Sequence, residues 1–261
     1  MLRAPCYIMS DAHLGFAPND VERAVVSFFR HVGESGGSLV VNGDLFEFWF
    51  EWRTVIPRQG FRALAALADL HDAGVPVLMI AGNHDCWGGE ILRDDAGIDY
   101  RLGPWLGDIA GWRVRIEHGD GLRPREDKRY RMLRHLLRNR LAIRSFRWLH
   151  PDLATPLATH SSHASRTYVA RDEGRGLREA AARAASADHT LDAIVFGHSH
   201  VATLERLPAE TVYGNPGSWL DAPTFLCVHD DRIALRQWDG SAESADLHAF
   251  HRRAKEPLPQ L

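Results

Sequence analysis

The sequence predicts a layered α/β fold, in which helices cover a sheet. Short apolar runs of strand length alternate with longer segments of helical periodicity along the first half of the chain. Polar motifs follow several of these runs directly, and α/β proteins place their ligand sites beyond the carboxyl ends of strands. A length of 261 residues suits one large domain of this class.

The first half alternates between expected strands and expected helices. Short apolar runs predict strands at residues 6–9, 39–41, 77–81 and 112–117. Helices are expected between them, at about residues 19–34, 60–73 and 89–96. Val25, Phe29 and Val32 recur at helical spacing in the first, and Gly74 with Pro76 ends the second.

The second half begins with an expected insert. Residues 123 to about 190 carry only helical patterns. Strands resume at residues 192–196, 202–207, 210–213, 224–228 and 233–238. Residues 240–261 contain Pro257 and Pro259, and we expect a loosely held tail there. The chain is therefore expected to be a single domain, residues 1–261, with a helical insert.

Composition limits the class of protein and its surroundings. Hydrophobic residues make up 45% and charged residues 25%, and the net charge is −3, which argues against nucleic acid as a partner. Cys6, Cys86 and Cys227 form no C-x-x-C pair, so we expect a reduced, cytoplasmic compartment. The sequence suggests neither a signal peptide, nor a membrane span, nor an obligate protein partner.

Five polar motifs follow expected strands and indicate a metal centre. They are Asp11-Ala12-His13, Gly43-Asp44, Gly82-Asn83-His84-Asp85, His118-Gly119-Asp120 and Gly197-His198-Ser199-His200. Each motif alone is typical of a turn, but five in this order indicate convergence on two divalent cations. Oxygen and imidazole donors without thiolate suit Mn²⁺ or Fe²⁺ and tolerate Zn²⁺, and we expect Mn²⁺.

The donors divide around Asp44, which is the expected bridge because it is the lone carboxylate of its loop. Asp11, His13 and one histidine of residues 197–200 could complete one ion. Asn83, His118 and the other histidine could complete the second. A metal pair of this kind activates water and clamps the oxygens of a phosphoryl group.

Two further residues are expected to act in catalysis. His84 follows the ligand Asn83 directly, so its ring should face the substrate and donate to charge on the phosphate or the leaving oxygen. Asp85 should accept from the far nitrogen of that ring and so fix its tautomer. Asp120 is expected to support the centre in a similar way.

The ordered motifs from Asp11 to His200 resemble those of the calcineurin-like metallophosphoesterase superfamily. The resemblance implies a four-layer α/β/β/α sandwich with the site at its rim. It also implies two ligand sets that share one carboxylate. The first is Asp11, His13, Asp44 and His200, and the second is Asp44, Asn83, His118 and His198.

The residues around these motifs look like the UDP-2,3-diacylglucosamine diphosphatase family. The aromatic run at residues 43–52 and the stretch at residues 118–130 carry this likeness. It implies cleavage of a nucleotide-linked glycolipid to UMP and a lipid sugar 1-phosphate in lipid A synthesis. The implied substrate contacts are Asn83, His84, Asp127, Tyr130, Ser162, Arg166 and His198. The chain departs from the family at His84, where the best-known members carry arginine.

The insert begins with a strongly basic segment. Residues 123–147 contain Arg123, Arg125, Lys128, Arg129, Arg131, Arg134, Arg138, Arg140, Arg144 and Arg147. Leu133, Leu136, Leu137 and Leu141 fall on one helical face, a pattern typical of membrane-surface or anionic-ligand binding. We expect a lid over acyl chains, with peripheral contact to the cytoplasmic face of the inner membrane. A solvated helix whose leucines pack on the core is the alternative.

Two other functions stay open at this point. A soluble metallophosphoesterase acting on nucleotides or phosphodiesters would use the same ligands and would need no lipid. A non-catalytic binding module could share the fold, but such modules usually lose ligands, and this chain keeps His84 and the whole expected ligand set.

Overall fold

The computed structural model describes residues 1–124, 126–156 and 172–252, and its strands form two mixed sheets. The seven-stranded sheet has the order β12-β11-β10-β1-β2-β3-β4. Its strands are β1 (Cys6–Met9), β2 (Ser38–Asn42), β3 (Val77–Ile80), β4 (Asp99–Arg101), β10 (Thr224–Val228), β11 (Arg232–Gln237) and β12 (His248–His251). The five-stranded sheet has the order β5-β6-β7-β9-β8. Its strands are β5 (Trp105–Ile109), β6 (Trp112–Ile116), β7 (Ala193–Val195), β8 (Thr203–Arg206) and β9 (Val212–Asn215).

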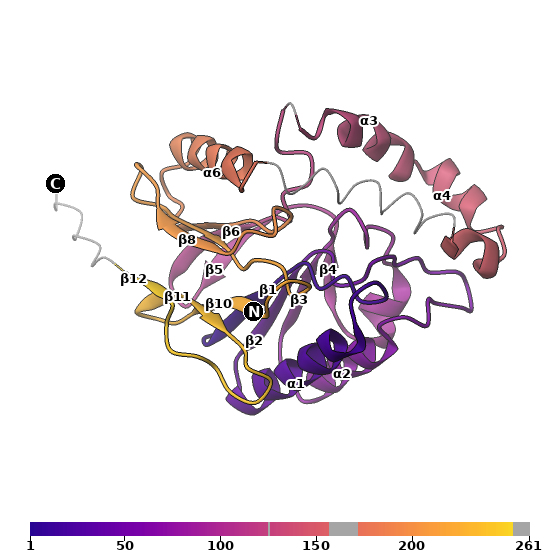
Figure 1. Cartoon of the computed structure of the whole chain (residues 1–261), viewed down its shortest axis with the longest axis horizontal. Coiled ribbons are helices and arrows are strands. Elements are labelled where there is room, and N and C mark those ends of the chain that lie inside the picture. Colours follow the sequence, from indigo (N-terminus) through magenta and orange to yellow (C-terminus); the bar gives the residue numbers. More distant parts are fainter. Residues whose placement is uncertain (125, 157–171, 253–261) are drawn as a thin grey trace.

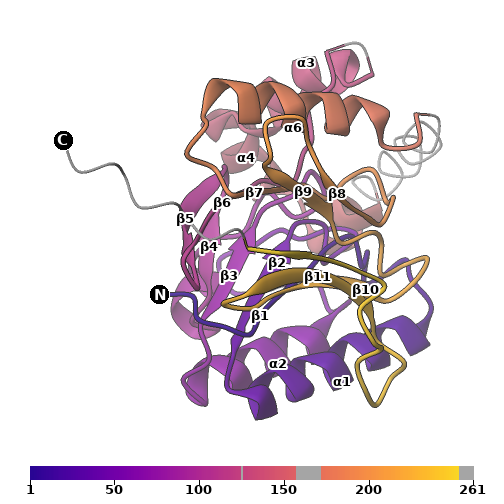
Figure 2. The ribbon, with the colours of Figure 1, turned by 90° about the vertical axis from the view of Figure 1, so that its left-hand side faces the viewer.

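The two sheets pack face to face, with helices on both outer faces (Figures 1 and 2). Ile8 and Val40 of the first sheet share one buried cluster with Val114 and Val195 of the second. Helices α1 (Asn19–Ser35) and α2 (Phe61–Asp72) cover the seven-stranded sheet. Helix α6 (Arg175–Ala187) covers the five-stranded sheet. The expected α/β/β/α layering is therefore confirmed.

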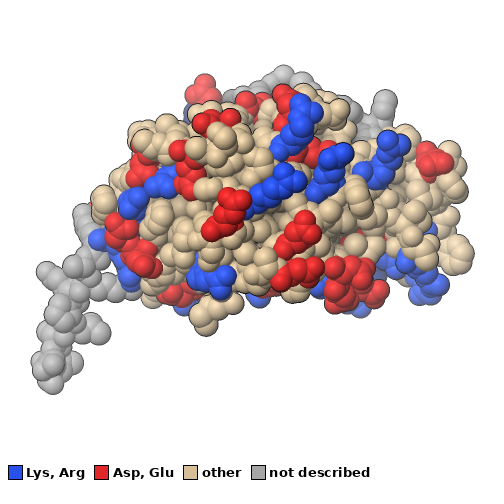
Figure 3. All heavy atoms as spheres, turned by 90° about the horizontal axis from the view of Figure 1, so that it is seen from below, with Lys and Arg blue, Asp and Glu red and all other residues tan. Residues whose placement is uncertain are grey.

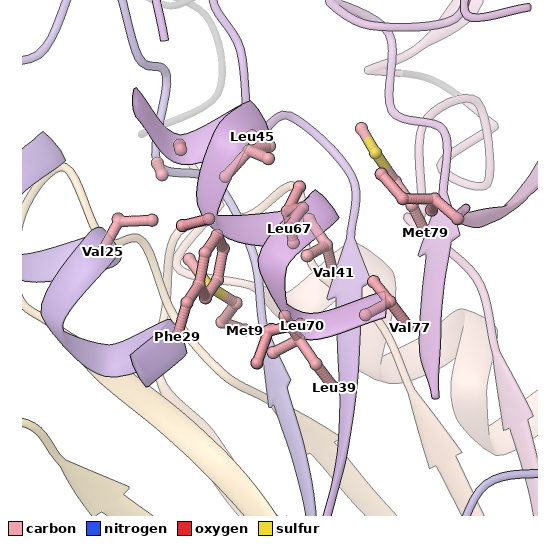
Figure 4. Packing of buried hydrophobic residues seen from close by; sticks show 14 of the residues in the cluster. Met9, Val25, Phe29, Leu39, Val41, Leu45, Leu67, Leu70, Val77 and Met79 are labelled. Atoms are coloured by element: carbon pink, nitrogen blue, oxygen red, sulfur yellow. The ribbon is translucent and has the colours of Figure 1, made fainter. Parts of the chain in front are cut away.

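The layer below the seven-stranded sheet follows from the helical spacing of apolar residues. Val25 and Phe29 of α1 and Leu67 of α2 point into one buried cluster with Met9, Val41 and Met79 of the sheet (Figure 4). The face seen from below carries basic and acidic side chains interspersed, as a solvated surface does (Figure 3). The sequence pattern thus fixes which side of each helix is buried.

Parallel pairing brings the motif-bearing ends of the strands to one rim. In the first sheet β1, β2, β3 and β4 run parallel, and in the second β6, β7 and β9 do. The carboxyl ends of β1, β2, β3, β6 and β7 lead into the five motifs. Since both sheets contribute, the site lies where the two sheets meet at their shared rim.

The insert expected at residues 123 to about 190 extends too far, because its last part belongs to the main fold. Leu177 and Ala181 of α6 pack on Ile194 and Phe196, so α6 belongs to the outer layer of the fold. Strands β4 and β5 were not expected. Strand β4 has only three residues and Gly107 interrupts β5, so neither strand forms a clear apolar run in the sequence. The short helix expected at residues 89–96 is a single π-helical turn, η1 (Ile91–Asp95).

Residues 126–147 form two helices rather than one. Helix α3 (Lys128–Leu137) ends before Asn139, whose side chain accepts from the amides of Leu141 and Ala142 and so starts α4 (Arg140–Phe146). Leu136 and Leu141 are 60% and 75% exposed. The alternative in which these leucines pack on the core is therefore wrong. Within the described residues, no helix combines the length and apolar character needed to cross a membrane.

The expected loose tail is wrong for residues 240–252. Strand β12 pairs with β11 at the edge of the large sheet. Glu243 accepts hydrogen bonds from Tyr7, His31 and Arg236, and Arg236 also pairs with Asp246. The prolines that suggested the tail lie in residues 253–261, outside the described residues.

The cluster around Glu243 predicts a pH-dependent stability. Burial alone would raise the pKa of Glu243, but hydrogen bonds from His31, Arg236 and Tyr7 hold it below its ordinary value. Glu243→Gln should therefore lower the free energy of unfolding by about 1 kcal/mol at pH 7, where the wild-type carboxylate is charged.

The difference should shrink as the pH falls from about 4.3, the ordinary glutamate pKa, through the lower folded value. Urea unfolding of both proteins between pH 7 and pH 3 measures this. A difference that stays constant over the whole range would show that the charge of Glu243 is not its source.

Candidate metal centre

The motif side chains meet at the shared rim. Asp44 Oδ2 lies 3.2 Å from His118 Nε2, which links the loop after β2 to the loop after β6. Asp11 Oδ1 lies 3.4 Å from His200 Nε2, and His13 Nε2 lies at the same distance from that nitrogen. These contacts join the two sheets through side chains that can bind a metal.

Among the described residues, carboxylates and histidines form three groups able to hold a cation. Within each group the ligand atoms lie within 4.8 Å of one another. The groups are Asp11, His13 and His200; Asp44, His118 and His198; and His13, Asp44 and His84. The first two groups match the division expected from the sequence, with Asp44 shared between the second and third.

The buried atoms of this site fit a bound cation. Asp11 Oδ1, Asn83 Oδ1 and His118 Nε2 are buried and find no hydrogen-bond partner in the described part of the chain. Buried polar atoms are almost always hydrogen-bonded in folded proteins, so three atoms of metal-binding type without a hydrogen bond need an explanation. These atoms of Asp11 and His118 have only ion-pair contacts there, with His200 and Asp44. Divalent cations would supply the partner, and the oxygen and imidazole donor set suits them.

The backbone at the site is held in an unusual conformation. Positive φ angles occur at Asp11 (55°), His13 (46°), Asp44 (53°), His198 (61°) and His200 (61°). The left-handed region costs a residue with a side chain about 1–3 kcal/mol, and such residues cluster at functional sites. Five of the seven expected ligands share this feature, which turns their side chains toward the rim.

Two motif glycines allow the close approach of the ligand loops. A Cβ on Gly82 would lie 2.1 Å from Asp44 Oδ1, and a Cβ on Gly43 would lie 2.3 Å from His118 Nδ1. Neither distance is sterically possible without movement of a ligand. These glycines are therefore required by the packing of Asp44 between neighbouring loops.

Three of the expected ligand imidazoles are supported at the nitrogen that faces away from the centre. Nδ1 of His118 donates to the carbonyl of Asn42 (2.8 Å), and Nδ1 of His200 lies 3.5 Å from Asp221 Oδ2. His13 Nδ1 lies 3.1 Å from Glu47 Oε2. In all three rings, Nε2 is left to face the centre.

The fourth imidazole, His198, meets a buried ion pair. Its Nε2 lies 3.3 Å from Arg123 and 3.9 Å from Asp127 Oδ1. Arg123 in turn donates to Asp127 Oδ1 from both Nε and a terminal nitrogen. Burial would raise the pKa of Asp127, but His198 and Arg123 hold it well below its usual range.

Mutual charges dominate the electrostatics of the ligands. Burial disfavours charge on Asp44 and on His118, yet each stabilises the charge of the other, so the pKa of Asp44 is low and that of His118 is high. In the same way Asp11 raises the pKa of His200 to about 10. Metal ligands must be deprotonated, so a bound cation takes the place of the protons on these imidazoles.

His84 lies at the centre as expected, but its support differs. Its Nδ1 lies 2.9 Å from the carbonyl of Glu47, and a carbonyl can only accept, so this contact fixes the tautomer. The expected role of Asp85 is therefore wrong. Its buried carboxylate instead accepts from the amides of Gly82 (2.7 Å) and Leu45 (2.9 Å) and ties two ligand loops together.

The expected substrate residues are only partly brought together. His84 and His198 belong to the centre, Asn83 lies between Gly82 and His84 in the ligand loop, and Asp127 reaches the centre through His198. The hydroxyl of Tyr130 donates to Asp120 Oδ2 (2.5 Å) and anchors α3 beside the ligand loop, which gives Asp120 a supporting role. Ser162 and Arg166 lie outside the described residues.

Sequence reasoning missed three supporting residues. Glu47 and Arg123 stood inside segments chosen for their aromatic and basic character, so their individual roles were not visible. Asn215 donates to the carbonyl of Gly197 and to Ser199, and so holds the turn that carries His198 and His200. The only signal for Asn215 was its place in a glycine- and proline-rich turn after a strand.

An apolar groove opens beside the loop that begins at Asp44. Phe48, Phe50 and Trp52 of this loop form a cluster against Ile143 and Phe146 of α4. Outside the cluster lies a groove of about 590 Å³. It is lined by Trp52, Arg53, Thr54, Val55, Arg140, Ile143, Arg144, Arg147 and Trp148. Trp49 is fully buried in the main core instead.

Comparison with known proteins assigns this site to a family. The family model of calcineurin-like phosphoesterases matches residues 4–202, so the chain belongs to this family. The clustered carboxylates and imidazoles agree with a divalent-metal-dependent phosphoesterase.

More particular relatives share one name, UDP-2,3-diacylglucosamine hydrolase. The protein of Porphyromonas gingivalis is 32% identical over 63% of this chain and 64% of its own length. Those of Nitrosococcus oceani and Stutzerimonas stutzeri are 25% and 28% identical over 94% of this chain, and the matches cover 92% and 96% of their lengths.

The close approach at Gly82 gives a direct test of the centre. In Gly82→Ala the new Cβ must displace the Asp44 carboxylate, so Mn²⁺ binding should weaken by at least about tenfold. Calorimetric titration of the metal-free chain measures this. Gly103→Ala is the matched control, because its Cβ meets nothing within 4 Å among the described atoms, and it should bind Mn²⁺ like the wild type. Equal affinity in the two variants would contradict the packing derived for Asp44.

Proposed function

We propose that this chain is a pyrophosphohydrolase that cleaves UDP-2,3-diacylglucosamine to UMP and 2,3-diacylglucosamine 1-phosphate. The observation that carries the proposal is the similarity to relatives of that name along almost the whole chain. The metal centre supports the chemistry, since a pair of divalent cations can polarise a phosphoryl group and activate the attacking water. The apolar, arginine-lined groove at the far end of the loop that begins at Asp44 supports the choice of a lipid substrate.

The residues of the centre would divide two Mn²⁺ ions between them. One ion is assigned to Asp11, His13, Asp44 and His200, and the other to Asp44, Asn83, His118 and His198. When bound, such ions supply Lewis-acid polarisation of the phosphoryl group and activation of water.

The protein itself contributes proton donation and positioning. With Nδ1 of His84 held by a carbonyl, donation from Nε2 requires the doubly protonated ring. Asp44 Oδ2 at 3.9 Å and Glu47 Oε2 at 3.8 Å supply the counter-charges for that form. His84 would then stabilise charge on the phosphate and on the leaving oxygen. Asn83, Asp127, Tyr130 and His198 are the proposed neighbours of the nucleotide and sugar.

The groove would hold the acyl chains of the substrate. Its aromatic and aliphatic walls can bury methylene groups, worth about 0.8 kcal/mol each. Arg140, Arg144 and Arg147 along its edge can meet anionic groups at the membrane surface. We propose that α3 and α4 rest on the cytoplasmic face of the inner membrane while the chains enter the groove.

Hydrolysis of the lipid substrate tests the function. With UDP-2,3-diacylglucosamine in detergent and Mn²⁺, the chain should release UMP, and Asp44→Ala should abolish release because the shared ligand is lost. UDP-N-acetylglucosamine and bis-p-nitrophenyl phosphate serve as soluble comparisons and should react at least about a hundredfold more slowly. Chelation of the metal should stop the reaction in every case.

Turnover of the soluble esters without the lipid would contradict the substrate but keep the metal chemistry. It would favour the soluble metallophosphoesterase, the alternative that the histidine at position 84 leaves open. No turnover of any ester would remove both enzymatic functions.

The exposed leucines of α3 and α4 predict binding to membranes. The wild type should bind vesicles containing anionic phospholipid at low salt, and binding should fall as salt rises. The double variant Leu136→Ser with Leu141→Ser should bind several-fold more weakly, because both side chains are exposed apolar surface. Val201→Ser, another exposed apolar side chain lying beyond the insert, is the control. Absence of wild-type binding at low salt would rule out this mode of attachment.

A further inference from the structure

We propose that Glu47 is a positioning residue of the metal centre, whose side chain orients the ligand His13 while its main chain orients His84. This inference rests on the metal centre proposed above but is independent of the substrate. Glu47 lies in the loop after β2, three residues beyond the shared ligand Asp44. Glu47 thus contacts both the proposed ligand His13 and the proposed proton donor His84.

The carboxylate of Glu47 stands behind the His13 ring. The side chain is 4% exposed, and Oε2 lies 3.1 Å from His13 Nδ1. A carboxylate can only accept, so Nδ1 carries the proton and the lone pair of Nε2 is left for a cation. Nε2 faces that cation's place, 3.4 Å from His200 Nε2 and 4.0 Å from Asp11 Oδ1.

The main chain of Glu47 stands behind the His84 ring. Its carbonyl lies 2.9 Å from His84 Nδ1, so this ring also has its proton on the outer nitrogen and Nε2 toward Asp44. The rings of His13 and His84 meet edge to face with centroids 4.8 Å apart. Displacement of Glu47 would therefore alter two adjoining rings of the centre.

Backbone pairing fixes where Glu47 lies relative to His13. The amide of His13 donates to the carbonyl of Asp44, and that of Leu14 donates to Leu45 (3.0 and 2.9 Å). The amide of Glu47 donates back to the carbonyl of Leu14 (3.0 Å). The loops after β1 and β2 thus run side by side, and this backbone pairing holds the Glu47 carboxylate next to His13.

The supports of His118 and His200 differ in kind from Glu47. His118 rests on a neutral carbonyl, and the carboxylate near His200 belongs to Asp221, whose side chain is 65% exposed. A buried carboxylate interacts more strongly with an imidazole than a solvated one does, because water screens it less. Loss of Glu47 should therefore weaken a metal site more than loss of Asp221.

Glu51 provides a matched control in the same loop. It is also buried, at 6% exposure, but it accepts from Trp49 Nε1 and from the amides of Ile91 and Leu92. Its carboxylate thus fastens the aromatic loop to η1 instead of orienting a ligand. Comparison of the two glutamates separates metal positioning from the stability of the loop.

The test measures Mn²⁺ binding by the full-length, metal-free chain. Calorimetry should find two ions for the wild type, and Glu47→Ala should weaken one of them about 10–100-fold. Glu47→Gln should weaken it less, because the amide oxygen can still accept from Nδ1. Electron paramagnetic resonance should show a coupled ion pair in the wild type and isolated Mn²⁺ in Glu47→Ala at the same metal concentration. Glu51→Gln should keep the affinity and the coupled signal while melting at a lower temperature.

Activity gives a second, independent readout. The Mn²⁺ concentration for half-maximal hydrolysis should rise about 10–100-fold in Glu47→Ala. At saturating Mn²⁺ its kcat should recover only in part, because the carbonyl of residue 47 still holds His84 but the counter-charge of the Glu47 carboxylate is lost.

Wild-type affinity and an intact coupled signal in both Glu47 variants would overturn the role of Glu47. An equal loss of affinity in Glu51→Gln would also overturn it, since loop stability would then explain the effect. A wild type that binds no ion pair would instead remove the metal centre itself. If Glu47→Ala fails to fold, the nearly isosteric Glu47→Gln still tests the role of Glu47. Its Mn²⁺ affinity should be lower than that of the wild type while its secondary structure is unchanged.

Discussion

The packing of Asp44 against Gly82 and His118 is the constraint on which the site depends. This carboxylate lies between loops of the two sheets, and it accepts from the amide of His84 while facing His118. Absence of a Cβ at Gly82 and Gly43 permits the approach. The spacing of the two sheets, set by their shared apolar layer, therefore also sets the distance between donors that belong to different sheets.

Several residues of the site have backbone conformations and buried polar atoms that cost free energy. Contacts in the rest of the fold must offset this cost. Five expected ligands have positive φ, and three buried ligand-type atoms make no hydrogen bond within the described chain. Backbone contacts behind the ligands stabilise this arrangement, as when Asp11 lies between the amides of His198 and Leu220 and the hydroxyl of Ser218. A rigid second layer of contacts thus keeps the donors arranged for a cation before one binds.

The fold and the convergence of the motif side chains could be predicted from sequence because both depend on local patterns. Apolar runs marked the strands, and the order of the motifs marked the side chains that meet at the rim. The partner of His84 could not be predicted, because the direction of its Nδ1 depends on how two loops pass each other in space. The same reason applies to α6, which helical periodicity alone cannot assign to insert or outer layer, and to β12, whose pairing partner is set by tertiary structure. The break at Asn139 did carry a local signal, since asparagine is a preferred cap.

Because the ligand groups draw on both sheets, any cation they hold acts as a cross-link between two halves of the molecule. Asp11 follows β1 of the large sheet, whereas His200 follows β7 of the small one. An ion that binds the folded chain and not the unfolded one adds RT ln(1 + [ion]/Kd) to its stability. Metal supply would then govern how long the folded chain persists as well as whether it is active.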